Sequence, residues 1–216
     1  MPDDSAPDHR IRSEAELREM IGQVDPIAVD KSIAAIDKYA RRFIGLSPFL
    51  TIATFDAKGN ADVSPRGDAP GFVQVLDDRT IAIPDRPGNN RLDTMTNIIE
   101  NPSVGLLFFV PGFDDTLRVN GKAVLTREPA LLAAATVNNR APKVMIRVTV
   151  EEVFLHCAKA LKRSKLWDPA QHVDRKTMPS LARMILEQVE HNKCSDEEFL
   201  EAADESIEQD YKENLY

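Results

Sequence analysis

The feature that most constrains the fold is a succession of short β-type segments between residues 49 and 156. The run Phe49–Phe55 combines β-branched and aromatic residues, and the turn-forming cluster 56–60 separates it from the next extended run. Such runs joined by short turns predict antiparallel hairpins. About six antiparallel strands in one span indicate a closed or stacked sheet. We therefore expect a mainly β fold with flanking helices.

The expected elements follow from the apolar periodicity and from the turn and capping residues. Strands are expected at 49–55, 61–64, 72–76, 80–83, 103–110, 116–126 and 143–156, and helices at 13–22, 91–100, 158–166, 179–190 and 196–214, with a short helix beginning at Pro129. A further helix is expected after Asp30 as its N-cap, with Ile33, Ile36, Tyr39, Ala40 and Phe43 on one face. The expected units are an N-terminal extension (1–29), a main domain (30–175) and a helical, acidic C-terminal extension (176–216).

Charge and composition exclude several classes of protein. The net charge is −8, and residues 195–216 contain nine acids and one base, so the rest of the chain is neutral overall. An acidic end argues against nucleic acid as a partner. No run approaches the ~20 apolar residues of a membrane helix, and the polar start lacks a signal peptide, so we expect a cytoplasmic protein. The two cysteines and four histidines are scattered, which predicts no metal site.

Two segments have the composition of a phosphate site. The first is Ser64-Pro65-Arg66-Gly67-Asp68, where a strand ends and Arg66 can offer a planar fork of donors to a phosphate. Ser64 would lie beside it. The alternative is an ordinary polar turn.

The second segment runs from Asp85 to Arg91, follows a strand and opens a helix. Free amides at a helix start favour an anion, and Gly88 lets the backbone approach a ligand closely. Arg86 and Arg91 add positive charge. The alternative is again a polar turn, in which Asn89 or Asn90 caps the helix.

Two further segments carry candidate binding residues. Arg118 and Asn120 are predicted to share one face of a strand, and a rim salt bridge is the alternative for Arg118. The basic stretch 157–169 ends near Trp167, the one tryptophan of the chain. This stretch could cover a flat anionic ligand, or it could be a surface helix that Trp167 anchors by packing.

Several segments together resemble the pyridoxamine 5′-phosphate oxidase-like flavoproteins, a family of FMN-binding split barrels. The matching segments occur in the family's order over residues 30–175 and are 64–68, 86–93, 97–102, 104–108, 116–121, 157–160 and 163–167. The resemblance implies a six-stranded antiparallel split barrel that forms a homodimer, with FMN at the subunit interface. It is closest to a branch of probable FMN-dependent proteins.

The resemblance also implies roles for individual residues. Ser64 and Arg66 would contact the flavin phosphate and ribityl region, and Arg86, Asn89, Asn90 and Arg91 would hold the phosphate. Arg118 and Asn120 would lie near the interface. Four residues near the end of the barrel domain would reach the cofactor of their own chain or of the partner chain. They are Lys159, Arg163, Ser164 and Trp167.

The chain departs from the true pyridoxamine phosphate oxidases at two motifs. Their Arg-x-Val-Leu-Leu-Lys strand is replaced by Ser-Pro-Arg-Gly-Asp at 64–68, and Leu161-Lys162-Arg163-Ser164 stands where they carry Arg-Leu-His. The resemblance therefore supports FMN as the cofactor more strongly than it supports pyridoxamine phosphate as the substrate. The expected function is an FMN-dependent oxidoreductase that passes a hydride or electrons between a donor such as NAD(P)H and a small-molecule acceptor.

Three alternatives remain open from the sequence. The chain could bind flavin or haem as a carrier or sensor, or it could use the deazaflavin F420 as a reductase. It could also be an interaction module whose acidic C-terminal helix docks a partner.

Overall fold

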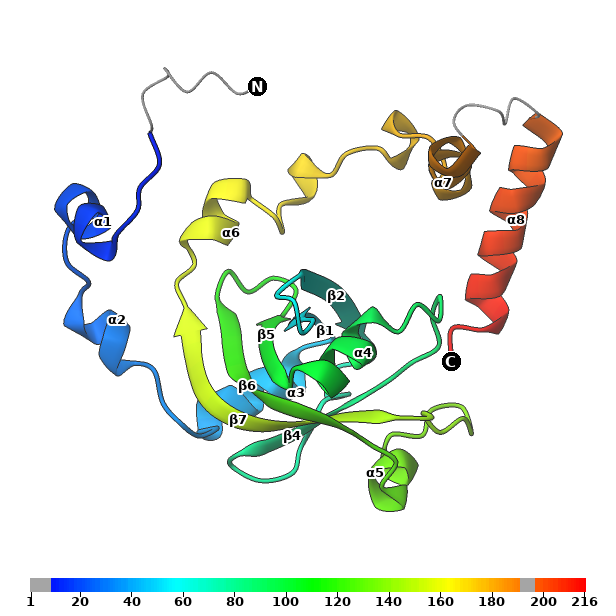
Figure 1. Ribbon diagram of the computed structural model, residues 1–216. Helices are drawn as coiled ribbons and strands as arrows, with labels where there is room; N and C mark the ends of the chain where they lie inside the picture. The colour runs from blue at the N-terminus through cyan, green and yellow to red at the C-terminus, as the bar shows by residue number, and fades with distance from the viewer. Residues whose placement is uncertain (1–8, 191–196) are drawn as a thin grey trace.

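One curved sheet of seven antiparallel strands forms the centre of the molecule (Figure 1). The computed structural model describes residues 9–190 and 197–216. The strands are β1 (Phe49–Phe55), β2 (Ala61–Gly67), β3 (Gln74–Val75), β4 (Thr80–Pro84), β5 (Ser103–Phe109), β6 (Thr116–Thr126) and β7 (Met145–His156). Their order is β2-β1-β5-β6-β7-β4-β3. The mainly β split-barrel class is confirmed. Each of the seven expected strand ranges contains a strand, one more than the six that the family resemblance implied.

The helices flank the sheet and form the two ends of the chain. They are α1 (Glu14–Ile21), α2 (Pro26–Asp30), α3 (Lys38–Leu46), α4 (Asp93–Glu100), α5 (Pro129–Ala134), α6 (Lys159–Ser164), α7 (Leu181–Glu190) and α8 (Glu197–Glu213), with 3-10 turns at Pro169–Gln171 (η1) and Arg175–Thr177 (η2).

The helix expected after Asp30 was wrong. Asp30 is the last residue of α2, and α3 begins only after Asp37, whose carboxylate accepts hydrogen bonds from the amides of Tyr39 (3.0 Å) and Ala40 (2.7 Å). Ile33 instead exchanges backbone hydrogen bonds with Val153 of β7. A long-range backbone pairing therefore interrupts a segment that was expected to be one continuous helix.

The core fills the concave side of the sheet. Alternate residues of the long strands point inward, so Leu117 and Val119 of β6 are buried while Arg118 between them is exposed. Phe43 and Ile44 of α3 and Ile98 of α4 join this core. Most of its other members are strand side chains, such as Leu50, Ile52, Ile81, Ile83, Leu106, Phe108, Ile146 and Val148.

A β-bulge between Asn120 and Gly121 bends β6 against β7. A Cβ atom at Gly121 would lie 2.1 Å from the carbonyl oxygen of Thr149, a distance that no side chain tolerates. Glycine is therefore required there by the close approach of two backbones.

Helix α4 is held against β1 and β2 by two polar contacts. The hydroxyl of Thr94 lies 3.1 Å from a carboxylate oxygen of Asp62, and Asn97 donates to the buried hydroxyl of Thr54 at 3.0 Å. The helix begins at Asp93, two residues later than expected. Its N-cap is Leu92, which adopts a left-handed conformation (φ 64°). These contacts place the segment before α4 beside β2.

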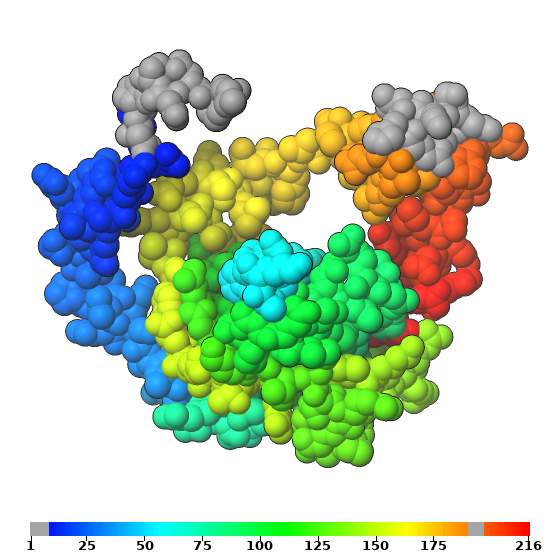
Figure 2. Space-filling view, in the orientation of Figure 1, coloured from blue at the N-terminus to red at the C-terminus, as the bar shows by residue number. Residues whose placement is uncertain are grey.

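The two ends of the chain project from the sheet as arms. Helices α1 and α2 bury none of their side chains, and α7 packs against α8. Figure 2 shows open space between the barrel and the C-terminal arm, which is coloured yellow to red. Within the described residues, no helix combines the length and the apolar character needed to cross a membrane.

Candidate functional site

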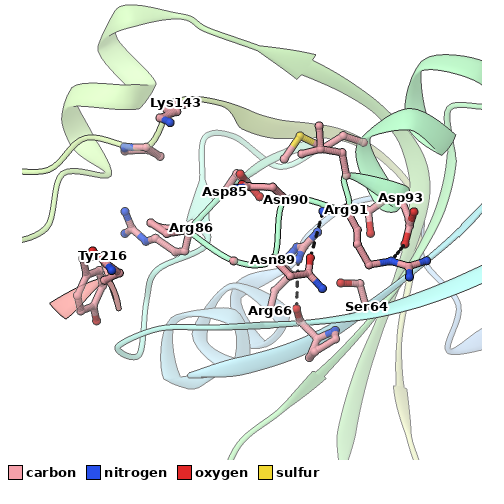
Figure 3. A pocket seen from close by; sticks show the side chains of 18 of the residues that line it. Ser64, Arg66, Asp85, Arg86, Asn89, Asn90, Arg91, Asp93, Lys143 and Tyr216 are labelled. Atoms are coloured by element: carbon pink, nitrogen blue, oxygen red, sulfur yellow. Dashed lines mark hydrogen bonds and ion pairs between the residues drawn. The ribbon is translucent and has the colours of Figure 1, made fainter. Parts of the chain in front are cut away.

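A cavity of about 740 Å³ opens between β2, the loop after β4 and the start of α4 (Figure 3). The segment 140–143 and the end of the C-terminal arm complete its wall. Both sequence segments that were expected to bind phosphate line this cavity. The predicted residues that the structure brings together there are Ser64, Arg66, Arg86, Asn89, Asn90 and Arg91.

Arg66 has the least satisfied guanidinium in the cavity wall. Its Nε atom is buried and has no hydrogen-bond partner among the described residues. Among the described residues, its one hydrogen bond is a long contact of 3.4 Å from a terminal nitrogen to the carbonyl of the adjacent Pro65. A buried polar group without a partner is costly, so this side chain is suited to an anionic ligand.

The loop from Pro87 to Leu92 lines the same cavity. In the part of the chain that the structure describes, the amides of Gly88, Asn89 and Asn90 donate no hydrogen bond. The side chain of Asn89 accepts from the amide of Arg91 at 3.1 Å and does not cap α4. The alternative in which Asn89 or Asn90 caps the helix is therefore wrong, and the first turn of α4 has no side-chain cap.

Arg86 is more firmly tied to the protein than Arg66. Its Nε donates to Asp68 at 2.7 Å and a terminal nitrogen donates to the carbonyl of Ala135 at 2.9 Å. The side chains of Arg86 and Asp68 are 15% and 2% exposed, so the ion pair is shielded from solvent. Burial acts to raise the pKa of Asp68, but hydrogen bonds from the Ala69 amide, Tyr216 and Arg86 together lower it. Asp68 is thus held ionised against Arg86.

The cavity is more basic than the molecule as a whole. Its wall contains five cationic side chains and three carboxylates, whereas the chain carries a net charge of −8. The cations are Arg66, Arg86, Arg91, Arg140 and Lys143, and the carboxylates are Asp62, Asp85 and Asp93. Exposed Arg91 is paired with Asp93 at 2.8 Å, which contributes little in water. The local charge favours an anion.

Asp85 is a partly buried carboxylate of the cavity wall. Burial raises its pKa above the ordinary value, and the nearby positive charge of Arg66 acts in the opposite direction. An ionised Asp85 therefore costs free energy in its own right.

The remaining predicted residues lie outside this cavity. Arg118 is exposed, with its guanidinium carbon 5.3 Å from the centre of the Phe154 ring. Asn120 lies on the same face and donates to Glu152 at 2.6 Å.

The predicted residues of the 157–169 stretch do not reach the cavity of their own chain. Lys159 and Arg163 are exposed on α6, and Ser164 hydrogen-bonds within that helix. Trp167 anchors the stretch to the barrel, because its Nε1 donates to the carbonyl of Phe113 at 2.7 Å.

Several cavity residues were missed by sequence reasoning. Asp85 stands in the second phosphate-type segment and could have been identified from its position at the end of a strand. Arg140 and Lys143 lie in a short basic turn before β7. Tyr216 has no local signal, because its contact with Asp68 spans 148 positions. Among the residues that the structure describes, no group of His, Cys, Asp or Glu is arranged to hold a metal ion.

Three solved structures illustrate which proteins the chain is similar to. HupZ from Group A Streptococcus is 23% identical over 56% of this chain and 93% of its own, with a TM-score of 0.46. A putative pyridoxamine 5′-phosphate oxidase from Lactobacillus delbrueckii is 20% identical over 56% and 99% (TM-score 0.43). General Stress Protein 26 from Bacillus anthracis is 15% identical over 53% and 88% (TM-score 0.42).

The family comparison is more specific. None of the curated proteins matches the chain. In contrast, the sequence model of the pyridoxamine 5′-phosphate oxidase family matches residues 36–157, which include the whole sheet and most of the cavity wall. The chain therefore belongs to the pyridoxamine 5′-phosphate oxidase family.

Proposed function

We propose that this chain binds FMN in the basic cavity and acts as an FMN-dependent oxidoreductase between a reduced donor, such as NAD(P)H, and a small-molecule acceptor. The observation that carries the proposal is the buried, unpartnered Nε of Arg66 in the cavity wall. A phosphomonoester supplies the acceptor oxygens that this guanidinium lacks.

The rest of the cavity fits the same group. The free amides of Gly88, Asn89 and Asn90 can donate to phosphate oxygens, and the uncapped first turn of α4 adds the positive end of its dipole. A volume of about 740 Å³ lies within the range of ~300–1,000 Å³ typical of small-molecule sites.

When bound, FMN supplies the hydride and electron transfer. The chain's own residues have the tasks of binding and orientation. Arg66 and the loop amides would hold the phosphate, and Ser64 on β2 would lie along the ribityl chain. The carboxylates Asp62 and Asp93 reduce the net positive charge of the cavity, because they offset two of its cations.

We further propose that the protein is a homodimer with the cofactor at the subunit interface. Lys159, Arg163, Ser164 and Trp167 lie outside the cavity of their own chain, so a role at the cofactor requires a second copy. Large apolar side chains that are exposed in the single chain are consistent with such an interface; they include Met20, Ile21, Ile27, Val63 and Leu155.

The test compares two ligands that differ only in the phosphate. The affinities of FMN and riboflavin are measured by flavin fluorescence for the wild type and for Arg66→Gln. Because a charge-assisted hydrogen bond to phosphate is lost, FMN affinity should fall roughly 10- to 100-fold in the variant. Riboflavin affinity should be unchanged.

The matched control is Arg147→Gln, an exposed arginine on β7 outside the cavity, which should bind both flavins like the wild type. An absorption spectrum of the purified protein distinguishes FMN from F420 and from haem. A purified protein that does not bind added FMN would contradict the proposal. Tight FMN binding without turnover by any common reductant would instead make the protein a flavin carrier.

A further inference from the structure

The end of the C-terminal arm closes the cavity on the side of Arg86. Asn214 and Tyr216 line the cavity, although α8 itself packs on α7. Figure 3 shows the Tyr216 ring beside the Arg86 side chain, at the edge of the cavity opposite Arg91.

Tyr216 contacts both members of the shielded ion pair. Its hydroxyl donates to one carboxylate oxygen of Asp68 at 2.9 Å, while the other oxygen of Asp68 accepts from Arg86. The guanidinium carbon of Arg86 also lies 5.6 Å from the centre of the Tyr216 ring, within the range of a cation–π contact. Tyr216 therefore constrains Arg86 directly and through Asp68.

A third contact holds this end of the chain in place. Arg140 donates to the backbone carbonyls of Tyr216 and Glu213. Arg140 lines the cavity itself, so the arm is fixed by the residues that form the anion site. The cavity has a volume of about 740 Å³ with Asn214 and Tyr216 in its lining, so the end of the arm forms part of the wall and does not fill the site.

We propose that Tyr216 is a positioning residue of the anion site: through Asp68 and its ring it fixes the guanidinium of Arg86 for a phosphomonoester. The C-terminal extension thereby becomes part of the binding site. This inference rests on the proposed FMN function.

The test uses the full chain and the same pair of flavins. Tyr216→Phe removes the hydroxyl and keeps the ring over Arg86, whereas Tyr216→Ala removes both contacts. Because one hydrogen bond is lost, FMN affinity should fall roughly 3- to 10-fold in Tyr216→Phe and further in Tyr216→Ala. Riboflavin affinity should not change in either variant, since Arg86 acts on the phosphate. Tyr211→Phe is the matched control on α8 and should behave like the wild type.

The outcomes separate this inference from the proposed function. An equal loss of FMN and riboflavin in the Tyr216 variants would assign the arm a purely structural role and would overturn the inference. Unchanged FMN binding in both variants, while Arg66→Gln loses FMN, would overturn it and leave the proposed function standing. A wild type that binds no FMN would overturn both.

Discussion

At the scale of single residues, the cavity distinguishes two arginines that look equivalent in sequence. Arg86 has a buried carboxylate partner and a carbonyl partner, so most of its desolvation cost is offset within the protein. Arg66 has a buried Nε with no partner among the described residues. A ligand anion therefore gains most from Arg66, and Arg86 acts from a position that Asp68 and Tyr216 define.

The carboxyl of Asp85 gives a pH-dependent prediction. Because burial raises its pKa in the folded state, ionisation of Asp85 destabilises the fold, and this penalty disappears as the pH falls through the raised pKa toward the ordinary value. Asp85→Asn should therefore unfold at a higher temperature than the wild type at pH 7–8. One kcal/mol corresponds to about 2–4 °C for a chain of this size.

The measurement is thermal unfolding of the ligand-free protein between pH 4 and pH 8. The advantage of the asparagine variant should shrink steadily as the solution is acidified. The variant should also bind FMN more tightly at neutral pH, since it removes a negative charge from the cavity wall. A stability difference that is the same at every pH would contradict the assignment.

At the scale of elements, the site depends on three short segments that meet at one edge of the sheet. β2 is an edge strand with alternating exposure, which directs Ser64 and Arg66 to one face. The loop between β4 and α4, in which Asn90 and Leu92 are left-handed, lines the same cavity as Ser64 and Arg66. Thr94 then ties α4 to Asp62 of β2. The hydrogen bond between the start of α4 and β2 thus helps to form the cavity.

The bulge in β6 gives a prediction about the sheet itself. Gly121→Ala places a methyl group 2.1 Å from the Thr149 carbonyl, so two backbones must separate. We expect a loss of about 3 kcal/mol in the free energy of unfolding, measured by denaturant titration. Gly105→Ala on β5 is the control, because its Cβ would meet no atom closer than 3.4 Å, and its cost should stay below ~1 kcal/mol. Equal costs would show that the bulge is not a required close contact.

At the scale of the whole molecule, a basic cavity lies in an acidic protein whose two arms stand away from the sheet. The helix α8 carries eight acids and one base, so most of the net negative charge is in the C-terminal arm. The end of that arm nevertheless docks on Arg86 and Arg140. At the other end of the arm, just after α6, Trp167 anchors the chain to the barrel. The arm therefore runs from one side of the barrel to the cavity.

Mixed dimers test whether α6 serves the cofactor of the partner chain. Arg66→Gln and Arg163→Ala should each weaken FMN binding as homodimers, because every site then contains one altered residue. In a purified mixed dimer, both changes fall in the same site, so about half of the sites should recover wild-type affinity. Titration with FMN measures the recovered fraction. No recovery would place Arg163 in the site of its own chain, and a chain that sediments as a monomer would contradict the dimer.

The sequence by itself determined the elements whose signals are local. The strands β1, β6 and β7 are long runs of alternating or β-branched residues, and the structure has them close to the expected bounds. The sequence also singled out the two segments around Arg66 and Asn89 that line the cavity, because guanidinium groups, glycine and a helix start have a chemical meaning that does not depend on the fold.

Only the tertiary structure decided how these parts meet. The bridge from Ile33 to Val153 displaced an expected helix, and only Gln74 and Val75 of the strand expected at 72–76 pair with β4. Tyr216 reached Asp68 across 148 positions, which no pattern of neighbouring residues encodes. Periodicity and capping report the free energy of a few adjacent residues, whereas such contacts depend on chain closure and burial over the whole molecule.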